Sequence, residues 1–283
     1  MQQPLLTSTP RPVAQIVRGR AASDGAGVKL TRLIGQPDLH TADPFLMLDA
    51  FRSDNPGDYI AGFPAHPHRG FETVTYMIAG RMRHRDNQGN EGVIEPGGVQ
   101  WMTAGRGIIH EEMPEQEDGL MWGFQLWVNL PAAQKRRAPG YQEVGDAAIP
   151  RDRREGATAK VITGTTGRGV TGAVTDVPTA PLYLDVHLDP DGRFEDPLPA
   201  DWQALVVAYD GAVSVAATAV PNQAVAVLGA GESVSVSAGA DGGKALVIAG
   251  KPLNEPVAWH GPFVMNTQQE LREAIADYQA GRF

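Results

Sequence analysis

Histidines and a glutamate that recur two positions apart are the residues of this sequence best suited to chemistry. His66 and His68 flank Pro67, and His110 and Glu112 repeat the spacing further along the chain. Residues i and i+2 of an extended segment project from the same face, so each pair can direct two ligand atoms at one ion. Two such pairs on neighbouring strands would supply three imidazole nitrogens and one carboxylate oxygen. This set suits Fe(II), Mn(II), Ni(II), Cu(II) or Zn(II), and on a six-coordinate ion it leaves two positions open, as in a catalytic site.

The remaining histidines have no partner at ligand spacing. We interpret them as surface or hydrogen-bonded side chains: His40, His84, His187 and His260. Asp185 lies two positions before His187, an arrangement that an exposed ion pair explains. We therefore expect no second metal in residues 150–265. Four aromatic residues near the second pair are expected to pack a core, with the lining of a substrate pocket as the secondary alternative: Trp101, Trp122, Phe124 and Trp127.

The elements that must position these ligands are predicted to be short strands. Runs rich in β-branched and aromatic residues are separated by glycine and proline, which indicates an all-β fold. They cover residues 28–34, 72–78, 182–188, 204–209, 224–228, 233–237 and 245–248. The exception is the C-terminal region, where Thr267 and Glu270 form a capping box and Leu271, Ile275 and Tyr278 recur at helical spacing. This pattern predicts a helix over residues 267–280.

A connector poor in large apolar residues over 131–155 suggests a boundary near residue 145. We therefore predict an N-terminal metal-binding domain over 1–145. A C-terminal domain without metal would cover 146–283 and end in the helix.

Composition excludes several classes of protein. The 283 residues carry a net charge of −9, which disfavours nucleic acid as a direct ligand. The absence of cysteine excludes disulfides, thiolate metal sites and cysteine nucleophiles. No signal peptide and no apolar run long enough for a membrane helix is visible, so we expect a cytoplasmic protein without a membrane partner.

Long contiguous motifs in both halves of the chain resemble the pirin family of the cupin superfamily. They are GFPAHPHRGFETV at 62–74, QWMTAGRGIIHEEMP at 100–114, QLWVNL at 125–130, GKPLNEP at 250–256 and HGPFVMNT at 260–267. The resemblance implies a bicupin, in which two tandem β-barrels are followed by a C-terminal helix. It also implies one metal ion per chain, usually iron and so Fe(II) here, bound by His66, His68, His110 and Glu112.

The choice of carboxylate departs from the general cupin pattern. That pattern takes its glutamate from the first motif, where Glu72 has the required spacing and shares strand parity with His66 and His68. The spacing from Glu72 to Gly80 is one residue longer than usual, and pirins take the glutamate from the second motif. We therefore choose Glu112 as the ligand and expect Glu72 to lie behind the ligands, with the exchange of the two glutamates as the open alternative.

The resemblance implies two kinds of function. The first is a quercetin 2,3-dioxygenase, which opens the heterocycle of a flavonol with O2 and releases carbon monoxide. Glu112 would then be the catalytic base that takes the proton of the 3-hydroxyl. The alternative is an iron-binding, redox-sensing protein that modulates a transcriptional or metabolic partner. No dinucleotide or nucleotide-phosphate motif calls for an organic cofactor.

Overall fold

The computed structural model describes residues 9–283, which form two compact units. The site unit comprises Gly19–Ile149, Asp176–Thr179 and Leu253–Phe283. The second unit comprises the described residues up to Arg18 together with Pro150–Thr175 and Ala180–Pro252. Each unit thus draws segments from both halves of the sequence, whereas a single boundary near residue 145 divides the chain into consecutive stretches. The boundary itself remains a prediction.

The site unit is built from two antiparallel sheets whose inner faces share one core. The seven-stranded sheet runs in the order β12 (Gly140–Val144), β9 (Val99–Thr103), β6 (Phe71–Ala79), β11 (Met121–Asn129), β4 (Phe45–Ser53), β3 (Val28–Ile34) and β2 (Arg20–Asp24). The four-stranded sheet runs in the order β5 (Phe63–His68), β10 (Ile108–Pro114), β7 (Met82–Asp86) and β8 (Glu91–Ile94). One cluster of buried side chains joins both sheets, with Leu30, Phe51 and Met77 from the first and Phe63 and Met82 from the second.

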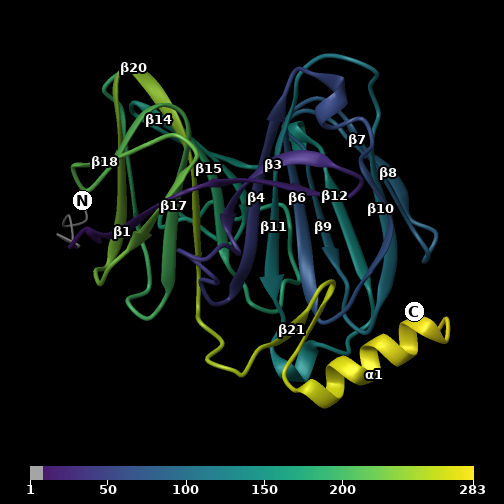
Figure 1. Cartoon of the computed structure of the whole chain (residues 1–283). Helices are drawn as coiled ribbons and strands as arrows, with labels where there is room; N and C mark the ends of the chain where they lie inside the picture. Colours follow the sequence, from purple (N-terminus) through teal and green to yellow (C-terminus); the bar gives the residue numbers. More distant parts are fainter. Residues whose placement is uncertain (1–8) are drawn as a thin grey trace. The chain divides into compact units, whose positions relative to one another are not determined.

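The segment that follows the second unit returns to the site unit. It forms the hairpin of β21 (Ala258–His260) and β22 (Phe263–Met265), then helix α1 (Gln268–Gln279), drawn in yellow in Figure 1. The predicted capping box is present, because the Thr267 side chain accepts from the Glu270 amide and the Glu270 side chain accepts from the Thr267 amide. Leu271 and Ala274 pack against the hairpin through Phe263 and Met265. The predicted helix is confirmed.

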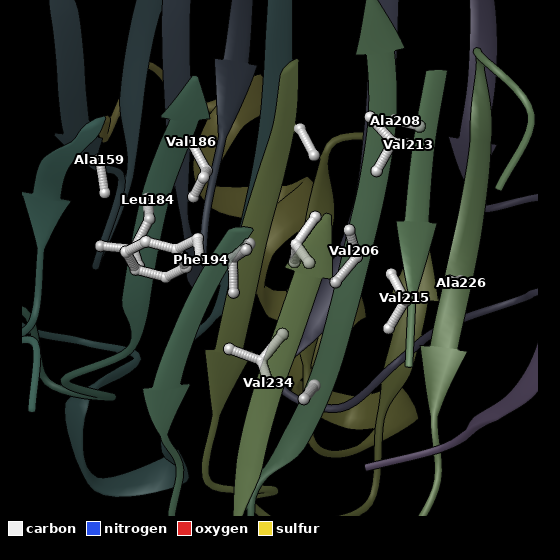
Figure 2. Close-up of a cluster of buried hydrophobic side chains, with 14 of the residues drawn as sticks. Ala159, Leu184, Val186, Phe194, Val206, Ala208, Val213, Val215, Ala226 and Val234 are labelled. Atoms are coloured by element: carbon white, nitrogen blue, oxygen red, sulfur yellow. The ribbon is translucent and has the colours of Figure 1, made fainter. Parts of the chain in front are cut away.

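The second unit is one antiparallel sheet that encloses its own core. The main order is β1 (Val13–Arg18), β19 (Ala224–Leu228), β17 (Gln203–Val215), β20 (Ser233–Gly250), β15 (Leu182–Leu188), β14 (Ala157–Thr163) and β13 (Arg151–Arg154). Beside this path, β16 (Arg193–Pro197) pairs with β20 and β18 (Thr218–Val220) pairs with β17. Figure 2 shows how alternate residues of β15, Leu184 and Val186, meet Phe194 and Val206 in the interior. Alternate residues of β15 thus face this core, as the period of two along a strand requires.

Short elements fill the predicted connector. It contains the 3₁₀ turns η2 (Ala132–Gln134) and η3 (Asp146–Ala148) together with β12 and β13, so it extends one sheet of each unit instead of only joining them. A third 3₁₀ turn, η1 (Pro56–Asp58), follows β4. The all-β class with a helix near the end of the chain is confirmed. None of the helices in residues 9–283 has the length and apolar character that crossing a membrane requires.

Candidate metal centre

Three of the four predicted ligands come together on two paired strands. In the antiparallel pair of β5 and β10, His110 lies opposite His66, and Ile108 lies opposite His68. One ring nitrogen from each histidine lies within 4.8 Å of the others, and the Nε2 atoms of His66 and His68 are 3.0 Å apart. No other group of three such ligands occurs in residues 9–283. The spacing of two thus brings His66 and His68 together on β5, and the pairing with β10 adds His110. Their role as metal ligands stays a prediction.

The hydrogen bonds of the rings leave nitrogen lone pairs available to a cation. His66 Nδ1 donates to the carbonyl oxygen of Pro64 at 2.8 Å, so its Nε2 carries a lone pair. His110 Nε2 is buried and has no hydrogen-bond partner. Burial and the neighbouring imidazoles hold the pKa values of His68 and His110 well below the ordinary range. Neutral, buried imidazoles with unpartnered nitrogens are the form that binds a metal ion, so the residues present fit one.

Glu112 lies on the same strand as His110 but is engaged elsewhere. Thr75 Oγ1 donates to its Oε1 at 2.5 Å, and Gln125 Nε2 donates to its Oε2 at 2.6 Å. Thr75 and Gln125 face each other on β6 and β11, so one cross-strand pair holds both carboxylate oxygens. The carboxylate is buried but is not within the group formed by the three histidines. Its role as a ligand remains a proposal.

Glu72, the alternative ligand, is placed on the other face of β6. It is three positions from Thr75, which directs its hydroxyl at Glu112, and an odd separation along a strand reverses the face. Thr103 donates to Glu72 Oε1 at 2.6 Å, and burial raises the pKa of this carboxyl to about 7. The even spacing of Glu72 from His66 and His68 does not put the three side chains on one face. The histidines belong to β5, whereas Glu72 belongs to β6.

His84 belongs to this site, although we interpreted it from the sequence as a surface or hydrogen-bonded side chain. It lies opposite Glu112 on β7, is fully buried, and its Nδ1 lies 3.4 Å from His110 Nδ1. Its Nε2 lies 3.5 Å from Asp86 Oδ2, a contact that fixes the ring from the other side. The available signal was the alternation of His84 and Asp86, which mirrors that of His110 and Glu112 on the neighbouring strand.

A cleft of about 640 Å³ opens beside the histidines. His66 and His68 line it, whereas His110 and Glu112 do not. The other residues of its walls are Asp24, Gly25, Ala26, Arg32, Met47, Phe63, Pro64, Gln125, Trp127, Trp259, Gly261 and Pro262. Trp127 packs against buried side chains of the site unit, as expected, and its ring also contacts His68 edge-on with 5.1 Å between ring centroids. It therefore serves the core and the cleft wall together.

The Asp185 and His187 pair forms as expected, but it is not fully exposed. Their contact of 2.9 Å joins a half-exposed imidazole to a carboxylate that is 1% exposed. Tyr209 donates a further hydrogen bond of 2.6 Å to Asp185. The absence of a second metal in this region remains a prediction.

Comparisons with known proteins match both halves of the chain. The family Pirin matches residues 27–128, and the Pirin C-terminal cupin domain matches residues 183–283. A pirin-like protein of Caulobacter vibrioides is 54% identical, with 96% of this chain and 99% of the relative covered. Human pirin is 44% identical, with coverage of 93% and 90%. The crystal structure of a quercetin 2,3-dioxygenase from Acinetobacter baumannii superposes with a TM-score of 0.88 at 35% identity, with coverage of 97% and 98%. The fold is therefore that of two cupin domains, and the chain belongs to the pirin family.

Proposed function

We propose that this chain is a metal-dependent dioxygenase that cleaves flavonols such as quercetin. One observation carries the proposal, namely the convergence of His66, His68 and His110 beside a cleft with aromatic walls. The similarity to the structure of a quercetin 2,3-dioxygenase from Acinetobacter baumannii supports the same reaction class. In that reaction both atoms of O2 enter the opened product, and one ring carbon leaves as carbon monoxide.

We propose Fe(II) as the ion, with Glu112 as the fourth protein ligand. Imidazole and carboxylate ligands suit iron, and the family resemblance favours it. A bound divalent ion would supply Lewis-acid activation of a hydroxyl oxygen and a binding position for O2. His84 and Asp86 would orient His110, in the way that hydrogen-bond partners fix the rings of metal-binding histidines.

Glu112 is proposed to take the proton of the flavonol 3-hydroxyl. The Glu112 carboxylate lies behind the cleft wall and is separated from the cleft by one side chain. That side chain is Gln125, which lines the cleft and donates to the Glu112 carboxylate. A base must reach its proton directly or through one water, and such contacts tighten when substrate binds. Gln125 and Thr75 would meanwhile keep the carboxylate directed at the site.

The cleft walls suit a flat, uncharged, hydroxyl-bearing ring system. Trp127 and Trp259 offer aromatic faces, with 6.0 Å between their centroids. Arg32 is clamped by Asp49 at 2.9 and 2.8 Å and by Asp24 at 3.0 Å. Because two carboxylates outweigh one guanidinium, this wall carries no net positive charge that would select an anion. Polar groups together with aromatic faces favour a polyphenol over a carboxylate substrate.

The test is incubation of Fe(II)-loaded protein with quercetin in air. Loss of the long-wavelength absorbance of quercetin, together with stoichiometric carbon monoxide, is expected for the loaded protein and not for the metal-free protein. Metal uptake without turnover would contradict the proposal and favour the redox-sensing alternative. A His110→Ala variant is the matched control, because it removes one of the three imidazoles and His110 does not line the cleft.

A further inference from the structure

Arg69, the residue that follows His68, contacts the C-terminal residues of the site unit. Arg69 is buried, and its Nη1 donates to Asp277 of α1 at 2.7 Å. Its guanidinium carbon lies 4.3 Å from the centroid of the Phe283 ring. The Arg69 backbone also donates to the Pro262 carbonyl at 3.2 Å and accepts from the Val264 amide at 3.0 Å. The end of β5 is therefore held by β22 and by α1.

The strand that carries His110 is tied to the same phenylalanine. Asn87 donates through Nδ2 to the carbonyl oxygen of Phe283 at 3.0 Å and accepts through Oδ1 from the amide of Ile109 at 3.1 Å. A Cβ atom on Gly107 would lie 2.8 Å from the Phe283 ring, and φ here is +140°. Only glycine allows so close an approach, so the ring packs directly on the chain that leads into β10.

We infer that Phe283 and Asp277 form a clamp that holds the adjoining ends of the two histidine strands in place and thereby strengthens metal binding. The inference rests on the proposed function. Metal affinity depends on how much ligand freedom is lost on binding, and supports outside the ligand set reduce that loss. Phe283 contacts Arg69, which directly follows β5, and reaches the start of β10 through Asn87 and Gly107. Asp277 in turn fixes Arg69. Both are positioning residues, because neither touches the three imidazoles.

The experiment measures Fe(II) affinity under anaerobic conditions by competition with a chromophoric chelator. We expect the double variant Asp277→Asn/Phe283→Ala to bind Fe(II) about tenfold more weakly, as is typical when the outer support of metal ligands is removed. The control is Glu273→Gln, on the same helix. This variant removes an exposed ion pair of 2.7 Å between Glu273 and Arg136, which does not contact either histidine strand. This control should bind as the unchanged protein does.

Two further measurements separate positioning from loss of fold. The single variant Phe283→Tyr keeps the ring and should restore the affinity that Phe283→Ala loses. The visible absorption of bound Co(II) should shift in Phe283→Ala at temperatures where its far-ultraviolet circular dichroism matches that of the unchanged protein. Equal Fe(II) affinity and an equal Co(II) spectrum in the folded double variant would overturn the clamp. Failure of the unchanged protein to bind Fe(II) would refute the proposed function and this inference together.

Discussion

At the scale of single residues, the roles of the buried acids follow from which face of a strand they occupy. Glu112 and Glu72 are both buried glutamates with a threonine hydroxyl donating to one oxygen. Glu112 projects toward the side where Thr75 and Gln125 lie, and Glu72 projects to the opposite side of β6. Sequence spacing alone left both open as ligands, because it gives the parity within a strand and not which strand a residue joins.

The histidines are expected to determine metal content without determining the fold. His66→Ala or His110→Ala should abolish stoichiometric metal, since each removes one of three converging nitrogens. The strands should persist, because the core of the site unit is built from other residues. Metal analysis of the purified variants checks this, with His260→Ala as a control at an exposed histidine. Full metal content in His66→Ala would contradict the assignment.

Replacement of Glu112 and replacement of Glu72 should have different effects on turnover and on metal content. Glu112→Gln keeps an oxygen but loses the base, so flavonol turnover should fall by roughly 10²-fold or more while metal content falls modestly. Glu72→Gln should leave both nearly unchanged, because its carboxylate faces Thr103. Turnover and metal content are measured in parallel for both variants. A greater loss of both in Glu72→Gln would identify the first-motif glutamate as the ligand.

Glu72 should also contribute a pH dependence of stability. Burial raises its pKa to about 7 in the folded chain from an ordinary value of 4.5, so the folded state binds the proton more tightly than the unfolded state does. The resulting stabilisation is fully present below pH 4.5 and is lost as pH rises through 7, on the order of 3 kcal/mol. Glu72→Gln should therefore remove this decline. Chemical denaturation of both proteins at pH 5 and pH 8 tests it, and an identical pH dependence would be the contrary result.

At the scale of elements, the seven apolar runs of the sequence fall in only six of the strands of residues 9–283, and contacts distant in sequence decided the others. The run 28–34 is β3, and 182–188 is β15, because each is rich in β-branched and apolar residues next to turn signals. The runs 233–237 and 245–248 are instead one strand, β20, whose glycine-rich middle pairs with β17 across two register shifts. The weak apolar content of that middle gave no local signal. His84 was missed for a related reason, since its importance lies in the pairing of β7 with β10.

Lys135 illustrates how one side chain can connect several elements. Its buried ammonium donates to the Gly70 carbonyl at 2.8 Å, to Asn129 Oδ1 at 2.6 Å and to the Val264 carbonyl at 3.0 Å. Lys135→Met leaves three buried acceptors without this donor, so the free energy of unfolding should fall by about 3 kcal/mol. The neighbouring exposed variant Arg136→Met should change it by less than about 0.5 kcal/mol. Equal effects in denaturant titrations would contradict this role.

At the scale of the whole molecule, the histidines of the candidate metal centre all belong to one unit. His66, His68 and His110 lie in the site unit, and within residues 9–283 Asp185 and His187 of the second unit have no third ligand grouped with them. Family resemblance predicted the duplication of the cupin domain from sequence motifs. It did not predict that each unit takes a segment from the other half of the chain, because motifs locate residues along the sequence and not in space.

This placement predicts at most one metal equivalent per chain. An imidazole and a carboxylate without a second imidazole make a poor transition-metal site. Inductively coupled plasma analysis after equilibration with excess Fe(II) and gel filtration should return one equivalent or less. A second equivalent that disappears in His187→Ala but persists in His66→Ala would disprove it.

The pairing of β1 with β19 also has a consequence for how the chain is made. Val17 lies opposite Val225, so the sheet joins two strands whose paired residues are 208 positions apart in the sequence. A ribosome therefore releases β1 long before its neighbour exists, and the nascent chain must keep this segment unpaired through most of synthesis. Such distant pairing slows folding, and a fragment beginning at residue 150 would present the edge of β19 to any other free strand.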